Sequence, residues 1–187
     1  SRVRGLPVHR PPGHDLRGGE GRRQYFDGGY VEGTTDFIFG QATAVFDHVH
    51  LHARAESYVT AASTPEGVPY GFVFLDGRLT ADPGVDSLLL GRPWRDFARV
   101  EKQGIIHSGL GRPAGWDDWG RPETHATVFY AEYATEGRGA DPGSRAAWSH
   151  RLTDAQGAAY TPEHIFAALA RSWDPDPAWF RRTVPTP

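Results

Sequence analysis

Short strand signals separated by glycine- and proline-rich turns recur along most of this chain, and helical signals appear only in its tail. In the first half these signals return roughly every 20–25 residues, a spacing found in stacked solenoid repeats. Parallel strands need long crossover connections, usually helices, whereas a sandwich would show many tight hairpin turns. Neither pattern is present. A stack of coils, each made of a few short strands and turns, accommodates the spacing best.

The composition limits the class of protein. A chain of 187 residues is long enough for one domain with a sizeable core. A hydrophobic content of 39% and a charged content of 23% are typical of soluble globular proteins. The formal net charge of −3 provides no basic field for nucleic acid, and no apolar run is long enough to cross a bilayer. We therefore expect neither a nucleic-acid nor a membrane partner.

The chain contains no cysteine, which excludes disulfides and thiolate metal sites. The segment 42–54 alternates apolar and polar residues and is interpreted as one strand with His48, His50 and His52 on the same face. Three histidines at this spacing can bind a metal. No fourth ligand is evident nearby, so a solvated strand face is the favoured interpretation, and no metal or other cofactor is expected.

A lone acid, Asp36, lies among β-branched and aromatic residues in the glycine-bounded stretch 33–40 (GTTDFIFG). Such residues favour a strand, and an acid within it is costly to bury unless it is paired. Two interpretations stay open from these residues alone. Asp36 points to water from an ordinary strand, or it belongs to a charged site whose partner lies elsewhere in the chain.

The tail predicts helices. Residues 153–156 fit a capping box, and Thr161 followed by Pro162 fits a helix start. Apolar residues then recur at helical spacing, which predicts a helix that covers the core. These residues are Ile165, Phe166, Leu169 and Trp173.

Two specific motifs, in this order, carry a family resemblance. Residues 30–40 (YVEGTTDFIFG) closely resemble the signature of pectin methylesterases, and residues 90–94 (LGRPW) resemble that family's second signature. Residues 115–119 (GWDDW), residues 130–133 (YAEY) and the tail tryptophan before Leu152 are also similar to the family. The resemblance implies an all-β, right-handed parallel β-helix with a short helical C-terminal tail. It also implies one domain, 1–187, that lacks the N-terminal coils and cap, with residues 150–187 packing on the solenoid.

The resemblance implies hydrolysis of the methyl esters of polygalacturonate. Asp36 would be the nucleophile, Asp15 the acid/base, and Arg92 the cation that pairs with Asp36. Asp15 precedes Asp36 by about one coil, and equivalent side chains on adjacent coils lie about 4.8 Å apart. We therefore expect the two carboxylates side by side. Two close carboxylates do not ionise equally, which suits an acid and a nucleophile.

Further roles follow from the same resemblance. His14 occupies the place of a family glutamine that stabilises the oxyanion, and histidine can also donate a hydrogen bond. Trp94 and Phe39 are expected to form apolar walls or stacking platforms for sugar rings, and Thr35 to contact substrate. The expected partner is methyl-esterified homogalacturonan. A secreted location is expected from the family, although no signal segment is visible in this sequence.

Two other functions stay open. A non-catalytic β-helix that binds an acidic polysaccharide would keep the same residues by descent. A retaining glycosidase also uses two carboxylates about 5 Å apart. The cation Arg92 argues against the glycosidase, because one of its two acids must stay protonated.

Overall fold

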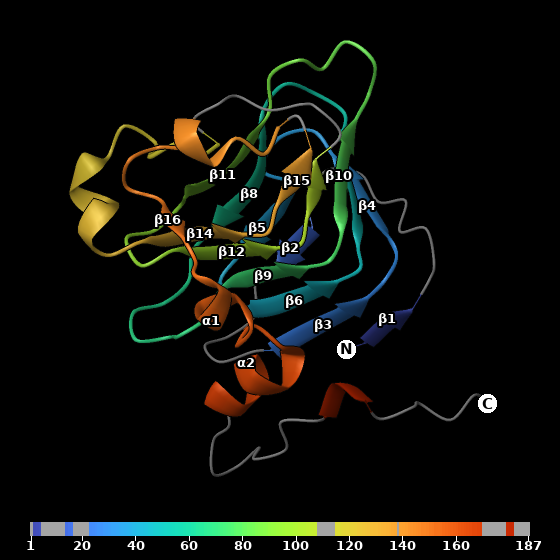
Figure 1. Cartoon of the computed structure of the whole chain (residues 1–187), viewed down its shortest axis with the longest axis vertical. Coiled ribbons are helices and arrows are strands. Elements are labelled where there is room, and N and C mark those ends of the chain that lie inside the picture. The colour runs from blue at the N-terminus through green and yellow to red at the C-terminus, as the bar shows by residue number, and fades with distance from the viewer. Residues whose placement is uncertain are drawn as a thin grey trace.

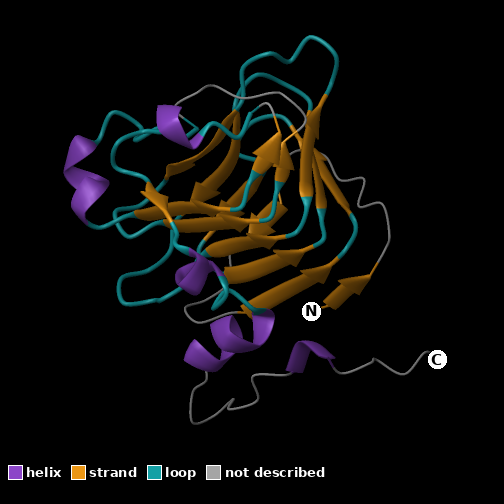
Figure 2. Cartoon of the chain, in the orientation of Figure 1, coloured by secondary structure: helices purple, strands orange, loops and turns teal. Residues whose placement is uncertain are grey.

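The computed structural model of the chain describes residues 2–4, 14–16, 23–107, 115–137, 139–169 and 179–181. Side chains are described for these residues except 2–4, 14–16, 106–107, 142 and 179. Three sheets wrap around a common core, and strands form most of the regular secondary structure of the described residues (Figures 1 and 2). Every strand pairing among these residues is parallel.

The first sheet extends along the whole described chain. Its strands, in spatial order, are β1 (Arg2–Arg4), β3 (Arg23–Asp27), β6 (Thr43–Asp47), β9 (Phe72–Leu75), β12 (Arg99–Gln103), β14 (Phe129–Tyr133) and β16 (His150–Arg151).

The second and third sheets complete each coil. In spatial order, the second contains β15 (Glu136–Gly137), β13 (Ile106–His107), β10 (Arg78–Ala81), β7 (His50–Ala53) and β4 (Tyr30–Gly33). The third contains β11 (Leu89–Pro93), β8 (Tyr58–Ala62), β5 (Ile38–Gly40) and β2 (His14–Leu16).

Consecutive strands lie in different sheets, and most neighbours within a sheet are three strands apart in sequence. The chain therefore runs from β3 through β4 to β5 and begins the next coil at β6. This is a parallel β-helix, which confirms the fold expected from the strand spacing and from the resemblance.

A side-chain ladder fills the inside of the solenoid. Phe26, Phe46 and Phe74 occupy the same position on successive coils, and their ring centroids lie 4.6 and 4.7 Å apart. This spacing equals the distance between neighbouring strands. Lys102 and then Glu132 continue the ladder on the next two coils. The register thus places a lysine in a column that begins with phenylalanines.

The C-terminal helices cover the opposite face of the first sheet (Figure 1). Ile165 and Phe166 of α2 (Pro162–Ala168) are fully buried with Val45 and Val73 of the sheet. The expected core-covering helix is therefore confirmed, although Trp173 lies outside the described residues. The capping box of Thr153 with Gln156 at the start of α1 (Asp154–Gly157) is also confirmed. Three short 3-10 helices are η1 (Pro122–Ala126), η2 (Pro142–Ser144) and η3 (Trp179–Arg181).

Sharp corners separate the first sheet from the second. Each of β3, β6, β9, β12 and β14 in the first sheet is followed directly by a residue whose φ angle is positive, between 47° and 67°. These corner residues are Gly28, His48, Asp76, Gly104 and Ala134. The N–H groups of the first four donate to a carbonyl of the next coil at 2.7–3.0 Å: Gly28 to Asp47, His48 to Leu75, Asp76 to Gln103 and Gly104 to Tyr133. The corners therefore stack as regularly as the strands.

The corner at His48 corrects one prediction. The segment 42–54 is two strands, β6 and β7, in different sheets, because the chain turns at His48, where φ is 55°. Asp36 also lies outside a strand. Its φ is 48°, and β5 begins two residues later. Aspartate adopts this left-handed conformation more readily than most residues. Alternation along the sequence could not reveal either bend.

Candidate active site

An ion pair between Arg92 and Asp36 lies on the third sheet. Arg92 Nε donates to Asp36 Oδ1 at 3.1 Å and Arg92 Nη2 donates to Asp36 Oδ2 at 2.6 Å. The exposed fractions of the two side chains are only 17% and 19%. A bidentate arginine–carboxylate pair of this kind fixes both groups in one plane. The structure therefore brings together two predicted residues that are 56 positions apart in the sequence.

The coil register explains how the two groups meet. Arg92 in β11 pairs with Ala61 in β8, which in turn pairs with Phe39 in β5. Asp36 precedes Phe39 by three residues, and its N–H donates to the carbonyl of Tyr58 at 2.8 Å. The guanidinium therefore extends across β8, a span of about two strand spacings. The long arginine side chain is suited to this reach.

Electrostatics keep this site charged. Burial lowers the pKa of Arg92, but the hydrogen bonds and the negative charge of Asp36 outweigh that effect, so the pKa is raised overall. Arg92 is consequently a permanent cation beside the carboxylate. A carboxylate that is held in a fixed orientation by a cation can act as a nucleophile toward an ester carbonyl.

Two aromatic rings enclose the Arg92 guanidinium. Its central carbon lies 4.0 Å from the ring centroid of Tyr58 and 3.7 Å from that of Trp119. Neither residue is among the site residues predicted from the sequence. The resemblance of residues 115–119 to the family is the available signal for Trp119. Tyr58 carried no signal, because it is simply the first residue of a strand.

The predicted substrate-contacting residues lie near this pair. Phe39 shares the register of Arg92, and its ring contacts that of Trp94 edge to face, with centroids 6.3 Å apart. Both rings are partly exposed, and Thr35, next to Asp36, is exposed. All three side chains are accessible enough to contact a ligand. Their contact with substrate stays a prediction.

Asp15 and His14 are described only as backbone. In β2, His14 pairs with Ile38 and Asp15 pairs with Phe39. The one-coil spacing predicted that Asp36 would be the register partner of Asp15 on the adjacent coil. That partner is Phe39, and Asp36 lies three residues before Phe39. The reason is the turn at Asp36, which ends before β5 begins. The catalytic roles of Asp15 and His14 stay predictions.

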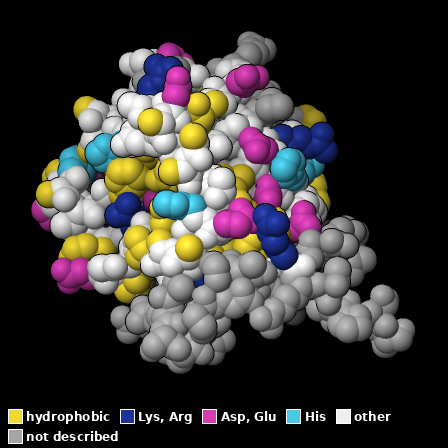
Figure 3. Space-filling model, turned by 60° about the horizontal axis from the view of Figure 1, so that its bottom comes forward, with side chains coloured by type: hydrophobic (Ala, Val, Ile, Leu, Met, Phe, Trp, Pro, Cys, Tyr) yellow, Lys and Arg dark blue, Asp and Glu magenta, His cyan; other side chains and the backbone are white. Residues whose placement is uncertain are grey.

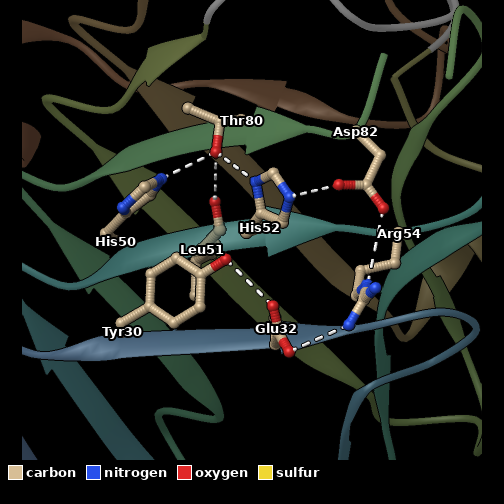
Figure 4. A network of polar contacts seen from close by, with 8 residues as sticks. All are labelled: Tyr30, Glu32, His50, Leu51, His52, Arg54, Thr80 and Asp82. Atoms are coloured by element: carbon tan, nitrogen blue, oxygen red, sulfur yellow. Dashed lines mark hydrogen bonds and ion pairs between the residues drawn. The ribbon is translucent and has the colours of Figure 1, made fainter. Parts of the chain in front are cut away.

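The predicted histidine cluster lies on the second sheet and is divided. His48 is at the corner and contacts Asp47, whereas His50 and His52 share one face of β7. Both of the latter rings lie 2.6 Å from the Thr80 hydroxyl (Figure 4). Among the described residues, no group of three or more histidine and acidic side chains is arranged to hold a metal ion.

Hydrogen bonding sets the proton positions in this network. Asp82 can only accept, so His52 Nε2 donates to it at 3.0 Å. His50 Nε2 and His52 Nδ1 each lie 2.6 Å from the Thr80 hydroxyl, whose single hydrogen can also be donated to the Leu51 carbonyl at 3.5 Å. Burial, followed by the charges of Arg78 and His52, lowers the pKa of His50. This face is a bonded network and not the freely solvated surface that was favoured from the sequence.

Two pockets among the described residues are lined by neither Asp36 nor Arg92. One of about 250 Å³ lies along β14 and β16 and includes Glu132 and Arg145 in its wall. A smaller one of about 120 Å³ borders the site, because Tyr58 forms part of its wall together with Glu56 and Leu89. Asp36 and Arg92 are partly exposed, and Thr35 beside them is exposed, so a ligand can reach the ion pair from the surface.

On the face of the molecule drawn in Figure 3, basic and acidic side chains are interspersed. Within the described part of the chain, no helix has the length and apolar character that a membrane span requires.

Comparison with known proteins identifies relatives of this arrangement. A family model described as Pectinesterase matches residues 19–168. "Putative pectinesterase 11" from Arabidopsis thaliana is 34% identical over 161 residues, which is 84% of this chain and 44% of that protein. "Pectinesterase 31" from the same plant is 35% identical over 133 residues, 71% of this chain and 42% of its own length. The chain thus spans less than half the length of these relatives.

Solved structures of pectin methylesterases are also similar to this chain. "Pectin methylesterase from Carrot" superposes with a TM-score of 0.73 at 29% identity, covering 80% of this chain and 52% of the carrot chain. A pectin methylesterase solved "in complex with hexasaccharide VII" gives a TM-score of 0.61 at 26% identity. That match covers 81% of this chain and 54% of the other.

Proposed function

Because the chain belongs to the pectinesterase family, we propose that it hydrolyses the methyl esters of polygalacturonate and releases methanol. The observation that carries the proposal is the bidentate pair of Arg92 with Asp36. An ester hydrolase of this type needs an oriented carboxylate nucleophile, and Arg92 holds the Asp36 carboxylate in a fixed orientation. The partly exposed rings of Phe39 and Trp94 beside the pair are suited to contact a polysaccharide chain.

In the proposed first step, a carboxylate oxygen of Asp36 attacks the ester carbonyl. The tetrahedral intermediate collapses as the bond to the methoxy oxygen breaks, and Asp15 gives that oxygen its proton. The products are methanol and an acyl-enzyme, a mixed anhydride with Asp36. An N–H of His14 would stabilise the oxyanion, and removal of one such donor typically costs about 10²–10³ in rate.

In the second step, Asp15 is a base. It takes a proton from water, and the resulting hydroxide attacks the substrate carbonyl of the anhydride. The bond to Asp36 breaks, which releases the galacturonate carboxylic acid and restores both aspartates. Arg92 holds the Asp36 carboxylate in place through both steps, which saves the reorientation that a free side chain would need. No metal or organic cofactor enters this scheme.

The substrate and setting follow the same logic. Methyl-esterified homogalacturonan is the proposed partner, with Thr35, Phe39 and Trp94 beside the reacting ester. A secreted protein would meet this polymer in plant cell walls, and the proposed location is therefore extracellular.

The test is methanol release from methyl-esterified polygalacturonate. Asp36→Ala is expected to abolish release, and Asp86→Asn, at an exposed acid on the loop before β11, is the matched control and is expected to retain it. Unchanged release in the Asp36 variant would remove that residue from the mechanism. Binding of the polymer by the wild-type chain without methanol would instead support the non-catalytic polysaccharide-binding relative. New reducing ends without methanol would support a glycosidase.

A further inference from the structure

The rings of Tyr58 and Trp119 both lie against the guanidinium of Arg92, with their centroids 4.0 and 3.7 Å from its central carbon. The two oxygens of Asp36 take hydrogen bonds in the plane of the same group. The guanidinium therefore makes two ionic hydrogen bonds with Asp36 and contacts two aromatic rings. An arginine side chain otherwise has many accessible rotamers, and these contacts restrict that freedom.

The segment that carries Trp119 is fixed to β11. The Leu90 N–H donates to the carbonyl of Gly115 at 2.7 Å, and the Asp117 N–H donates to that of Gly91 at 3.2 Å. Beyond the tryptophan, an Arg121 guanidinium N–H donates to the carbonyl of Pro93. Hydrogen bonds to backbone groups of β11 thus hold this segment beside the strand of Arg92 on both sides of Trp119.

Trp119 itself has an unusual conformation. Its φ is 59°, which is a rare value for a bulky residue, and its N–H donates to Asp117 Oδ1 at 2.7 Å. It is also the one large hydrophobic side chain in the described part of the chain that is exposed, at 40%. Burial in the core therefore does not explain its position. Strained residues of this kind are concentrated at functional sites.

We propose that Trp119 is a positioning residue for the reaction: together with Tyr58 it clamps the guanidinium of Arg92, and through Arg92 it orients the Asp36 carboxylate. This inference rests on the proposed function and adds a role to it. Trp119 acts on the turnover step and not as a platform for sugar. The distinction matters, because an exposed tryptophan beside a polysaccharide site would otherwise be interpreted as a stacking surface.

The kinetic test compares Trp119→Leu with Trp119→Phe. Loss of the cation–π contact is expected to lower kcat by about 2- to 30-fold in the leucine variant, with KM changed less than about twofold. Phenylalanine keeps a ring face and is expected to restore most of kcat. Phe129→Leu, which removes a ring of the first sheet that lies 4.6 Å from the central guanidinium carbon of Arg99, is the matched control and is expected to keep kcat. A raised KM with unchanged kcat would overturn the proposal in favour of a sugar platform.

A double-mutant cycle tests whether Trp119 acts through Arg92. In an Arg92→Lys background the planar group is absent, so Trp119→Leu is expected to lower kcat further by less than about twofold. An undiminished effect in that background would contradict the proposed route.

A third measurement does not depend on activity. The rings of Tyr58 and Trp119 lie against the Arg92 guanidinium, so ring currents are expected to place its Nε–H NMR signal at higher field in the wild-type chain than in Trp119→Leu. The signal should move to lower field in Trp119→Leu and stay in Phe129→Leu. An unshifted signal in the wild type would overturn the clamp itself. If the wild type shows the shifted signal but releases no methanol, the proposed function and the kinetic role fail while the clamp stands.

Discussion

Lys102 lies directly above Phe74 inside the solenoid, at the same position on the next coil, with its Nζ 5.3 Å from the ring centroid. The ring of Trp116 is 5.5 Å from the same nitrogen. The Lys102 side chain is 1% exposed, and its Nζ has no hydrogen-bond partner among the described residues. A protonated amine in this position lacks the acceptors that usually stabilise a buried charge.

Lys102→Met is expected to stabilise the protein at neutral and acidic pH. Burial lowers the pKa of Lys102 to about 7, against 10.5 in the unfolded chain, while the charge of Glu132 partly opposes the shift and that of Arg145 adds to it. Between these values the unfolded chain holds a proton that the folded chain has released, so stability rises as pH rises from about 7 toward 10.5. Methionine removes this dependence.

The measurement is urea unfolding of the wild type and Lys102→Met across this pH range. The variant is expected to be more stable by about 1–4 kcal/mol below pH 7, a gain typical of replacing buried charges with apolar groups of similar size. The difference should shrink as pH rises. A variant less stable than the wild type at every pH would show that Lys102 has an acceptor in solution.

Glu101→Gln is expected to remove a fall in folding stability that occurs as pH rises from about 4.5 to about 8. Glu101 is 1% exposed under the C-terminal helices, near Tyr70 and Tyr160, and Arg99 Nε lies 3.6 Å from its carboxylate. Burial raises the pKa of Glu101 from 4.5 to about 8, with the Arg99 charge partly opposing the shift. The folded chain therefore keeps a proton that the unfolded chain has lost, and stability falls as pH rises between these values.

Unfolding measurements between about pH 4 and pH 9 test this prediction. The fall should be present in the wild type and in Glu66→Gln, a control at an exposed acid, and absent in Glu101→Gln. An equal slope in all three proteins would exclude Glu101 as its source. Together, Glu101 and Lys102 predict a minimum in stability near pH 7–8.

The stacked corners predict opposite effects for two reciprocal substitutions. At Gly104, φ is 62°, and a Cβ would lie 2.1 Å from Asp76 Oδ1, so Gly104→Ala is expected to destabilise by about 1–3 kcal/mol. At Ala134, φ is 47° on an exposed corner, and Ala134→Gly removes that strain at the cost of a more flexible unfolded chain. We expect Ala134→Gly to be neutral or stabilising by up to about 1 kcal/mol. Thermal unfolding of both variants measures the contrast, and a destabilised Ala134→Gly would contradict the strain argument.

Arg92→Lys tests the need for the bidentate geometry. Lysine keeps the positive charge but cannot donate to both oxygens of Asp36 in one plane. We expect kcat/KM for methanol release to fall about a hundredfold, the size of loss that a small displacement of a reacting group produces. Arg151→Lys, at an exposed arginine, is the control and should keep the wild-type rate. Full activity in Arg92→Lys would mean that charge alone is sufficient.

The sequence was enough to predict the architecture for a physical reason. Strand propensity, turn residues and helix caps are local properties, and each coil repeats them. The capping box at Thr153, the proline start of α2 and the core-covering Ile165 and Phe166 are all where the local pattern placed them. Short strands without helical crossovers cannot form an ordinary parallel sheet, and without many tight hairpins they do not form a sandwich. Stacked coils are the remaining arrangement that pairs their backbone groups.

The sequence could not locate the bends. Asp36 and His48 both lie within segments that alternate or cluster like strands, yet each has a positive φ. The bend at His48 separated that residue from the face that His50 and His52 share on β7. The bend at Asp36 placed that residue three positions before the register partner of Asp15. Hydrogen bonds from both residues to neighbouring coils stabilise these conformations, and those bonds depend on residues distant in sequence.

The sequence by itself determined the repeating strands, the capped helical tail and, through resemblance, which charged residues to examine. The tertiary structure decided which of those residues meet. It brought Arg92 to Asp36 across an intervening strand, placed the rings of Tyr58 and Trp119 against the guanidinium, and put Lys102 on a column of phenylalanines. The physical reason is that contacts within a coil are set by local preference, whereas contacts between coils are set by the register of stacking.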